Sequence, residues 1–267
     1  IYVQPAAGDA GGALGSALAV WHIMLKNKRV IQKNLMQSSL LGPSFSNSKI
    51  KSCLDNLGAK YEELSDQELF KSVAEIINSG FLVGWFQGKT EYGPRALGNR
   101  SILADPRKID MQKTINSKIK FREGFRPFAP AILEDHINKF FTPAVVNPFM
   151  LFVLKFKDEY ILNQKEVIES EGFEKLNVKK SIFPSITHVD YSARVQSVSE
   201  KTNLTFYNLL KSFYDLTKCP MLINTSFNIY NEPIVNTVID AYKCFLTSDL
   251  DYLVCGNFIL NKAKQYQ

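Results

Sequence analysis

The sequence has few cysteines and histidines, and this scarcity narrows the kinds of site that it can hold. Its 267 residues include four cysteines and three histidines. No two cysteines form a C-x-x-C pair, and no histidine lies near a cysteine in the sequence. Structural zinc sites need several clustered thiolate or imidazole ligands, so such a site is not expected. We expect reduced, mostly buried thiols, as in a cytosolic protein.

Long apolar stretches are also missing. No run reaches the roughly 18 consecutive apolar residues of a membrane-spanning helix. The first residues, IYVQPAAGDAGG, lack the basic region followed by an apolar stretch that marks a signal peptide, and they lack an initiating methionine. We therefore expect a cytoplasmic protein without membrane contact, and we expect the chain to be a piece of a longer protein.

Positive charge is concentrated in one stretch. Residues Lys89–Arg126 contain ten basic and four acidic residues, so this stretch alone accounts for the formal net charge of +6. The remaining residues balance to zero. A local excess of positive charge indicates an anionic ligand more than it indicates solubility.

A loop at the start of this stretch carries basic residues among glycines. The apolar run Phe81–Phe86 predicts a strand, and the sequence GKTEYGPRALGNR follows it with Lys89, Arg95 and Arg100. Glycines let backbone N–H groups approach a ligand closely, and arginines bind phosphate through two parallel hydrogen bonds. The loop therefore predicts an anion site, although a solvated surface charge is the plainer explanation of any single basic residue.

The pattern of apolar residues predicts alternating helices and strands. Helical spacing predicts helices at Ala13–Lys26, Ile50–Leu57, Asp66–Asn78, Ile109–Phe121, Leu204–Leu216 and Val238–Leu246. Short apolar or alternating runs predict strands at Phe81–Phe86, Phe149–Phe156, Ala193–Val198, Met221–Ile223 and Tyr252–Leu260. Residues 157–180 show no clear period. The interleaving of the two kinds of element favours an α/β fold.

A glycine-rich turn, Gly8–Gly12, precedes the first predicted helix. Such a turn at a helix N-terminus can bind phosphate. Asp9 within it can cap the helix or hold a cation, and capping is the more common role of an aspartate at such a position.

Two short motifs have compatible chemistry. Lys120-Phe-Arg122 supplies two cations that can hold a phosphate and an adjacent carbonyl oxygen. Ser226-Phe-Asn228 supplies neutral donors and acceptors that can orient a planar, amide-like group. Each motif is weak alone, because it occurs by chance in many proteins.

Four longer motifs occur in order along the chain. They are GWFQGKTEYGPRALGNRSILADPR, KFREGFRPFAPAIL, THVDYSARVQ and NTSFNIYNEPIV. Together they resemble the C-terminal domain of the O-carbamoyltransferases, which include nodulation-factor, cephalosporin and tobramycin carbamoyltransferases. The resemblance covers roughly residues 66–262. It implies a YrdC-like α/β fold, a twisted mixed sheet with flanking helices.

The N-terminal QPAAGDAGGALGSAL resembles the last segment of the preceding domain in this family, which has an actin-like ATPase fold. The resemblance implies a boundary between residues 1–45, the tail of that domain with a linker, and residues 46–267. In that upstream domain the residue matching Asp9 helps hold Fe²⁺ or another divalent metal. The resemblance thus favours a metal role for Asp9 over a helix cap.

The resemblance also implies an activity. Carbamoyl phosphate and ATP, with Mg²⁺ on the nucleotide, give carbamoyl-adenylate, and the carbamoyl group then passes to a hydroxyl of a small-molecule acceptor. The residues implied in the first step are Arg95, Lys120 and Arg122 as catalytic groups, with Arg126, His188, Arg194, Asn224, Ser226 and Asn228 binding carbamoyl phosphate or ATP. The plainer alternatives are surface salt bridges for the arginines, a structural histidine, and a polar turn after a strand.

The chain departs from the family pattern at Tyr191 and Asn231, where glycine is usual. Asparagine tolerates a left-handed backbone, whereas tyrosine adopts it only at a cost. Tyr191 also places bulk beside Arg194, so the shape of that wall of the site is open.

A rival hypothesis is a nucleotide- or RNA-binding module without turnover, because a basic cleft attracts nucleic acid. The aromatic residues of the basic stretch, Phe121, Phe125 and Phe128, lie among prolines and are expected in the core. Exposed stacking aromatics, typical of single-strand binders, are then missing. RNA binding is the less favoured hypothesis, and a homodimer is compatible with the sequence.

Overall fold

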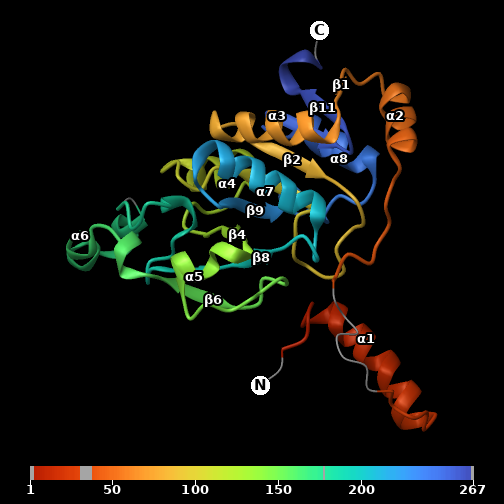
Figure 1. Ribbon diagram of the computed structural model, residues 1–267, viewed down its shortest axis with the longest axis horizontal. Coiled ribbons are helices and arrows are strands. Elements are labelled where there is room, and N and C mark those ends of the chain that lie inside the picture. Colours follow the sequence, from red (N-terminus) through yellow and green to blue (C-terminus); the bar gives the residue numbers. More distant parts are fainter. Residues whose placement is uncertain (1–2, 31–37, 177, 266–267) are drawn as a thin grey trace.

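The computed structural model describes residues 3–30, 38–176 and 178–265 (Figure 1). Positions 31–37 of the predicted linker lie outside the described residues. An eight-stranded mixed sheet has the order β1-β11-β10-β2-β3-β9-β4-β8, and a second sheet has the order β5-β6-β7. The β10–β2 and β4–β8 pairs are parallel, while the other neighbours in the large sheet are antiparallel. The predicted α/β class, a mixed sheet with flanking helices, is confirmed.

The strands are short. They are β1 Glu62–Glu63, β2 Val83–Phe86, β3 Arg100–Ala104, β4 Ala129–Leu133, β5 Phe141–Thr142, β6 Val153–Phe156, β7 Ser192–Arg194, β8 Gln196–Val198, β9 Met221–Ser226, β10 Tyr252–Cys255 and β11 Phe258–Asn261. The α-helices are α1 Asp9–Ala19, α2 Asn47–Asn56, α3 Asp66–Asn78, α4 Met111–Lys118, α5 Ile137–Phe140, α6 Gln164–Glu169, α7 Leu204–Thr217 and α8 Val238–Thr247.

Helix α3 shows how the sequence sets the elements. The Ser65 hydroxyl accepts from the backbone N–H of Glu68, and the Glu68 carboxylate accepts from the backbone N–H of Ser65, which completes a capping box. The apolar face of α3 is buried against α7, and α3, α7 and α8 pack on the large sheet. The helix occupies the predicted residues.

The end of β9 positions the site. β9 lies between β3 and β4, and its residue Asn224 pairs with Ala129, the first residue of β4. Thr225 and Ser226 extend past the start of β4 while they still pair with β3. This step in the sheet leaves room beside β9 for the basic segment that precedes β4.

Several predicted strands were wrong in extent. The run Phe149–Phe156 forms a strand only from Val153, and its side chains alternate between exposed and buried. The run Ala193–Val198 divides into β7 and β8, which belong to different sheets. Tyr252–Leu260 is a hairpin of β10 and β11. Hydrophobic runs alone do not indicate where a chain turns between sheets.

Four strands were not predicted at all: β3 and β4 in the middle of the large sheet, and the two-residue strands β1 and β5. Pro130 lies within β4. A proline cannot donate to a sheet, but β8 pairs with β4 only from Ala131 onward, so Pro130 is tolerated.

The N-terminal segment projects from the rest of the molecule (Figure 1). The predicted turn Gly8–Gly12 was wrong, because α1 begins at Asp9 and includes the glycines that follow it. The helix continues as a π-helical segment, Val20–Met24, whose Trp21 and Ile23 are exposed. Within the described ranges no helix is long and apolar enough to span a membrane. The four cysteines are free thiols, and three of them are buried.

Candidate functional site

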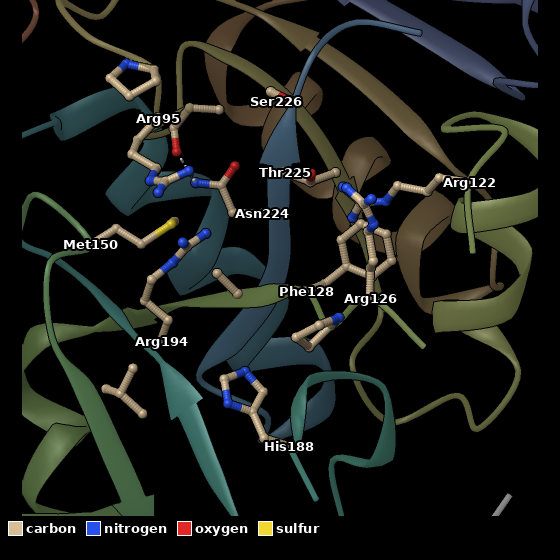
Figure 2. Close-up of a pocket in the computed structure, with 15 residues that line it drawn as sticks. Arg95, Arg122, Arg126, Phe128, Met150, His188, Arg194, Asn224, Thr225 and Ser226 are labelled. Carbon is tan, nitrogen blue, oxygen red and sulfur yellow. Dashed lines mark hydrogen bonds between the residues drawn. The ribbon is translucent and has the colours of Figure 1, made fainter. Parts of the chain in front are cut away.

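A cavity of about 420 Å³ lies beside the end of β9 (Figure 2). The loop after β2 and the segment before β4 form two of its walls, and β6 and β7 contribute a third. Its lining residues are Pro94, Arg95, Ala96, Arg122, Arg126, Pro127, Phe128, Ala129, Met150, Val153, His188, Arg194, Asn224, Thr225 and Ser226. The structure thus brings together seven of the predicted site residues from the four separate motifs.

Four arginines face this cavity, and no carboxylate is among the described residues that line it. Figure 2 shows Arg95 and Arg194 on one side of β9 and Arg122 with Arg126 on the other. Burial, with Arg126 nearby, lowers the pKa of Arg122, and burial, with Arg95 nearby, lowers the pKa of Arg194. Both guanidiniums remain charged at neutral pH. They stand in an electropositive environment that an anionic ligand would relieve.

Arg122 is held in place by its neighbours. Its Nε donates to Asn116 Oδ1 at 2.7 Å, and its guanidinium lies over the Phe128 ring at 5.2 Å from the centroid. Phe121, between Lys120 and Arg122, has a φ of 43°. A left-handed residue other than glycine is strained, and such strain is common where side chains are held for function. Asn116 is a supporting residue that the sequence did not suggest.

Glu91 shapes the loop that carries Arg95. Its Oε1 accepts hydrogen bonds from the backbone N–H groups of Leu97, Asn99 and Arg100 at 2.7, 2.9 and 3.2 Å. Glu91 is buried, and the three bonds close the loop into a tight turn. Sequence reasoning counted Glu91 only as an acidic residue within the basic stretch.

The predicted anion role of Arg100 was wrong. Arg100 begins β3 and is fully buried. Its guanidinium lies 3.6 Å from the centroid of the Phe86 ring, and it donates to the carbonyls of Gln87, Gly88, Asn99 and Pro43. Its hydrogen bonds tie the loop after β2 to the residues before α2. Lys89 is exposed and does not line the cavity.

Lys120 lies behind the cavity wall and is not one of its lining residues. Its Nζ donates to the backbone and side-chain oxygens of Ser226 and Asn228 at 2.6 to 3.1 Å. Burial, with Arg122 nearby, lowers its pKa to about 7. The two predicted short motifs therefore contact each other directly, through the Lys120 ammonium and the oxygens of Ser226 and Asn228. Asn228 likewise does not line the cavity.

His188 is positioned by a chain of hydrogen bonds. Ser192 Oγ donates to Asp190 Oδ1 at 2.5 Å, since a carboxylate can only accept. The Ser192 oxygen is then free to accept from His188 Nδ1, which lies 3.0 Å away. This arrangement favours the tautomer with the proton on Nδ1 and leaves Nε2 as an acceptor. Burial lowers the His188 pKa, so the ring is neutral at pH 7.

Asn224 reaches the cavity from the middle of the sheet and is 1% exposed. Its Nδ2 donates to the Ala96 carbonyl at 3.1 Å and to Gln196 Oε1 at 2.7 Å. Gln196 is the last residue of the quoted motif THVDYSARVQ, but no role was predicted for it. Ser226 also lines the cavity and takes part in the Lys120 cluster.

Arg126 and Asp9 are both exposed, as is Arg95. Arg126 faces the cavity and also pairs with Glu123 at 2.9 Å, which is the plainer role considered for it. Asp9 is the first residue of α1, outside this cavity. The described residues contain no group of three or more side chains able to hold a metal ion, so a metal role for Asp9 stays a prediction.

Two expectations about neighbouring residues change. Phe121 and Phe125 are 54% and 46% exposed rather than in the core, and only Phe128 is buried. Exposed aromatic residues, which are typical of single-strand binders, are therefore present in the basic stretch. Tyr191 and Asn231 have φ values of 61° and 58°, so both adopt the left-handed conformation that favours glycine. Tyr191 does not line the cavity, so its side chain does not narrow the wall beside Arg194.

Residues 74–262 match the family model described as the carbamoyltransferase C-terminus. The chain belongs to this carbamoyltransferase family. It is 49% identical to the uncharacterized protein sll1178 of Synechocystis over 100% of the chain and 44% of that protein. It is 39% identical to the nodulation protein NolO of Bradyrhizobium diazoefficiens over 98% of the chain and 44% of that protein. The chain thus spans less than half the length of these relatives.

Solved structures give weaker similarity. HypF of T. kodakarensis aligns with a TM-score of 0.40 and 17% identity over 65% of this carbamoyltransferase-family chain and 19% of HypF. Full-length HypF in the phosphate- and nucleotide-bound form aligns with a TM-score of 0.44 and 16% identity over 76% and 23% of the two chains. Similarity at this level does not bear on function.

Proposed function

We propose that the cavity beside β9 binds carbamoyl phosphate and ATP and forms carbamoyl-adenylate. The observation that carries this proposal is the set of four arginines facing one cavity with no carboxylate among its described lining residues. Acyl-phosphate chemistry requires positioned cations more than a covalent nucleophile. The family membership of the chain points to the carbamoyl group as the part that is activated.

The proposed reaction balances with one water. Water cleaves carbamoyl phosphate to carbamate and inorganic phosphate. A carbamate oxygen then attacks the α-phosphorus of ATP, the bond to the bridging oxygen of the β-phosphate breaks, and pyrophosphate leaves. Arginines on both sides of β9 would hold the two sets of phosphates and stabilise the charge on the leaving group.

Mg²⁺ would come with the nucleotide. The described lining residues of the cavity include no carboxylate, which is the ligand that Mg²⁺ prefers in proteins. We therefore assign the ion to the ATP phosphates and to water. It would neutralise part of their charge, and the arginines would neutralise the rest.

The acceptor hydroxyl and the transfer step belong to this proposal only for the full-length protein. We place the acceptor, a small-molecule alcohol, at a separate site that includes Asp9 and its divalent metal. The support is that Asp9 is exposed on the projecting N-terminal segment, outside the arginine cavity.

Pyrophosphate exchange tests the first step. Labelled pyrophosphate should enter ATP only when the full-length protein has both ATP and carbamoyl phosphate. Calorimetry should show ATP binding in the same sample. A well-folded protein that neither binds ATP nor catalyses exchange would refute the proposal.

A second candidate, nucleic-acid binding, is favoured by one observation. Phe121 and Phe125 are exposed beside Arg122 and Arg126, which is an arrangement suited to stacking bases. RNA affinity would fall steeply with added salt, whereas exchange requires defined small substrates. Gel-shift titrations of a mixed-sequence RNA at two salt concentrations separate the two functions.

A further inference from the structure

Asn224 holds a buried acceptor for which no partner exists among the described residues. Its Oδ1 has no hydrogen bond, although the residue is 1% exposed. Buried polar atoms are almost always paired, because leaving one unpaired is costly. This exception lies in the wall of the proposed site.

The orientation of the amide is fixed by what surrounds it. A backbone carbonyl can only accept, so the Asn224 atom 3.1 Å from the Ala96 carbonyl must be Nδ2. The second hydrogen on Nδ2 goes to Gln196 Oε1 at 2.7 Å. Both amide hydrogens are used, so Oδ1 cannot exchange places with the nitrogen without losing two bonds.

Gln196 is fixed in turn. Its Nε2 donates to the Leu97 carbonyl at 2.9 Å, and it is 3% exposed. That bond determines which end of the Gln196 amide faces Asn224. The series of hydrogen bonds from Leu97 through Gln196 to Asn224 therefore leaves Asn224 Oδ1 as its last, unpaired atom. In Figure 2 the Asn224 nitrogen points to the Arg95 side and the oxygen points away from it.

The Asn224 oxygen differs from the arginines of this cavity because it can only accept a hydrogen bond. The four arginines are donors only, and they suit phosphate oxygens. A fixed Oδ1 repels those oxygens and attracts an N–H group of a ligand. Whatever occupies this position must carry hydrogen-bond donors next to an anion.

We propose that Asn224 Oδ1 accepts a hydrogen bond from the amino group of the carbamoyl substrate and makes the site selective for it. The inference rests on the proposed function of the cavity. Gln196 is a positioning residue, because it acts through Asn224. The site then rejects an acyl phosphate that has a methyl group in place of the amino group, since the buried oxygen would stay unpaired.

Spacing favours the carbamoyl amino group over the amino group of adenine. In carbamoyl phosphate the nitrogen is separated from phosphorus by one carbon and one bridging oxygen. In ATP the ribose lies between the base and the phosphates. Asn224 lies between the two pairs of arginines, so its partner belongs to a group directly beside a phosphate.

Acetyl phosphate is the matched probe, because it keeps the phosphate and the carbonyl but lacks the amino group. The full-length protein should catalyse pyrophosphate exchange at least about tenfold faster, in kcat/KM, with carbamoyl phosphate than with acetyl phosphate. The variant Asn224→Ala should bring this ratio close to one. Gln196→Met keeps Asn224 and its Oδ1 but removes the hydrogen bond that fixes the Asn224 amide, so that the amide can rotate. This variant should give a ratio between those of wild type and Asn224→Ala.

Controls separate selectivity from folding. Asn163→Gly, at the left-handed residue before α6, which does not line the cavity, should leave the ratio unchanged. Affinity for inorganic phosphate, measured by calorimetry, should stay within about twofold of wild type in Asn224→Ala. If Asn224→Ala fails to fold, the ratio in Gln196→Met decides.

Two failures are distinguishable. If the wild type catalyses no exchange with carbamoyl phosphate, the proposed function is wrong and this inference falls with it. If the wild type catalyses exchange but both variants keep its ratio, the cavity has the proposed function and Asn224 is not the selecting group. The adenine alternative would appear as a loss of preference for ATP over purine riboside triphosphate in Asn224→Ala, with the acyl-phosphate ratio unchanged.

Discussion

Lys120 Nζ lies 2.6 Å from Asn228 Oδ1, and this contact joins the end of α4 to the residues that follow β9. The same ammonium donates to both oxygens of Ser226. Ser226 lines the cavity, whereas Lys120 does not. Lys120 thus fixes the cavity wall from behind, and we expect it to act through Ser226 rather than by touching substrate.

The Lys120 cluster predicts a pH effect on stability. Burial lowers the Lys120 pKa from 10.5 to about 7 in the folded protein. Between these values the unfolded chain binds more protons, so this lysine makes the free energy of unfolding rise with pH. Below about pH 7 the lysine is charged in both states, so the full cost of burying its charge lowers the free energy of unfolding. The free energy of unfolding, measured in urea, should therefore rise from pH 7 to pH 9 more in wild type than in Lys120→Met. A difference that does not change with pH would contradict the expectation.

Arg122→Ala should reduce carbamoyl-phosphate-dependent exchange by about a hundredfold, which is the scale of losing one preorganised charge-stabilising group. Arg122→Lys should recover only part of the loss, because lysine keeps the charge but not the planar fork that contacts Asn116. Lys179→Ala, at an exposed residue outside the cavity, is the control and should have almost no effect. Equal losses in the two alanine variants would mean that the cavity is misplaced.

The sequence was sufficient for helices α3 and α7 and for seven of the residues that line the cavity. Helix α3 could be located to the residue, because a capping box and a five-residue apolar face coincide in it. Arg95, Arg122, Arg126, Arg194, His188, Asn224 and Ser226 could be proposed from motifs, and they do meet in one cavity. Motifs that occur in order carry this information because each contributes one or two residues to the same cavity.

The sequence could not separate the roles of neighbouring basic residues. Arg95 and Arg100 occur in one glycine-rich loop, yet one faces the cavity and the other is buried on Phe86. The difference arises from β3, whose pairing with β2 and β9 takes Arg100 into the sheet. Long-range pairing of this kind leaves no local signal. Gln196 was missed because its partner Asn224 is distant in the sequence. Asn116 was missed because its partner Arg122 lies across the turn that follows α4.

His188 should be neutral and carry its proton on Nδ1 at pH 7. The reason is its bond to Ser192, whose own proton goes to Asp190. Burial lowers the pKa of the ring below its usual 6.5, so it should gain a second proton only at acidic pH. Nitrogen-15 NMR of labelled histidine would report the tautomer and its titration. In Ser192→Ala the preference for Nδ1–H should be lost, while a spectrum that does not change would contradict the proposed chain.

The loop before β3 should not tolerate a side chain at Gly98. Its φ is +102°, and an added Cβ would lie 2.1 Å from Phe206 Cδ1 in α7. Gly98→Ala should lower the free energy of unfolding by about 3 kcal/mol or more, from overpacking together with backbone strain. Gly15→Ala, in α1 with nothing within 4 Å, is the control and should be neutral or slightly stabilising. Urea denaturation measures both.

Asp9 should matter for transfer and not for activation. It lies outside the arginine cavity, at the start of the helix that projects from the rest of the molecule (Figure 1). In the full-length protein, Asp9→Ala should therefore keep pyrophosphate exchange within about twofold of wild type. If Asp9 helps hold a divalent metal for the acceptor hydroxyl, the variant should form no carbamoylated product, because a metal site that loses one of its few protein ligands binds its ion poorly. Mass spectrometry of reactions with aminoglycoside, cephem and sugar alcohols would report the product, and metal analysis would report the ion. Carbamoylated product at the wild-type rate would show that transfer does not depend on Asp9, and loss of exchange would show that the two steps are not separate in the way proposed.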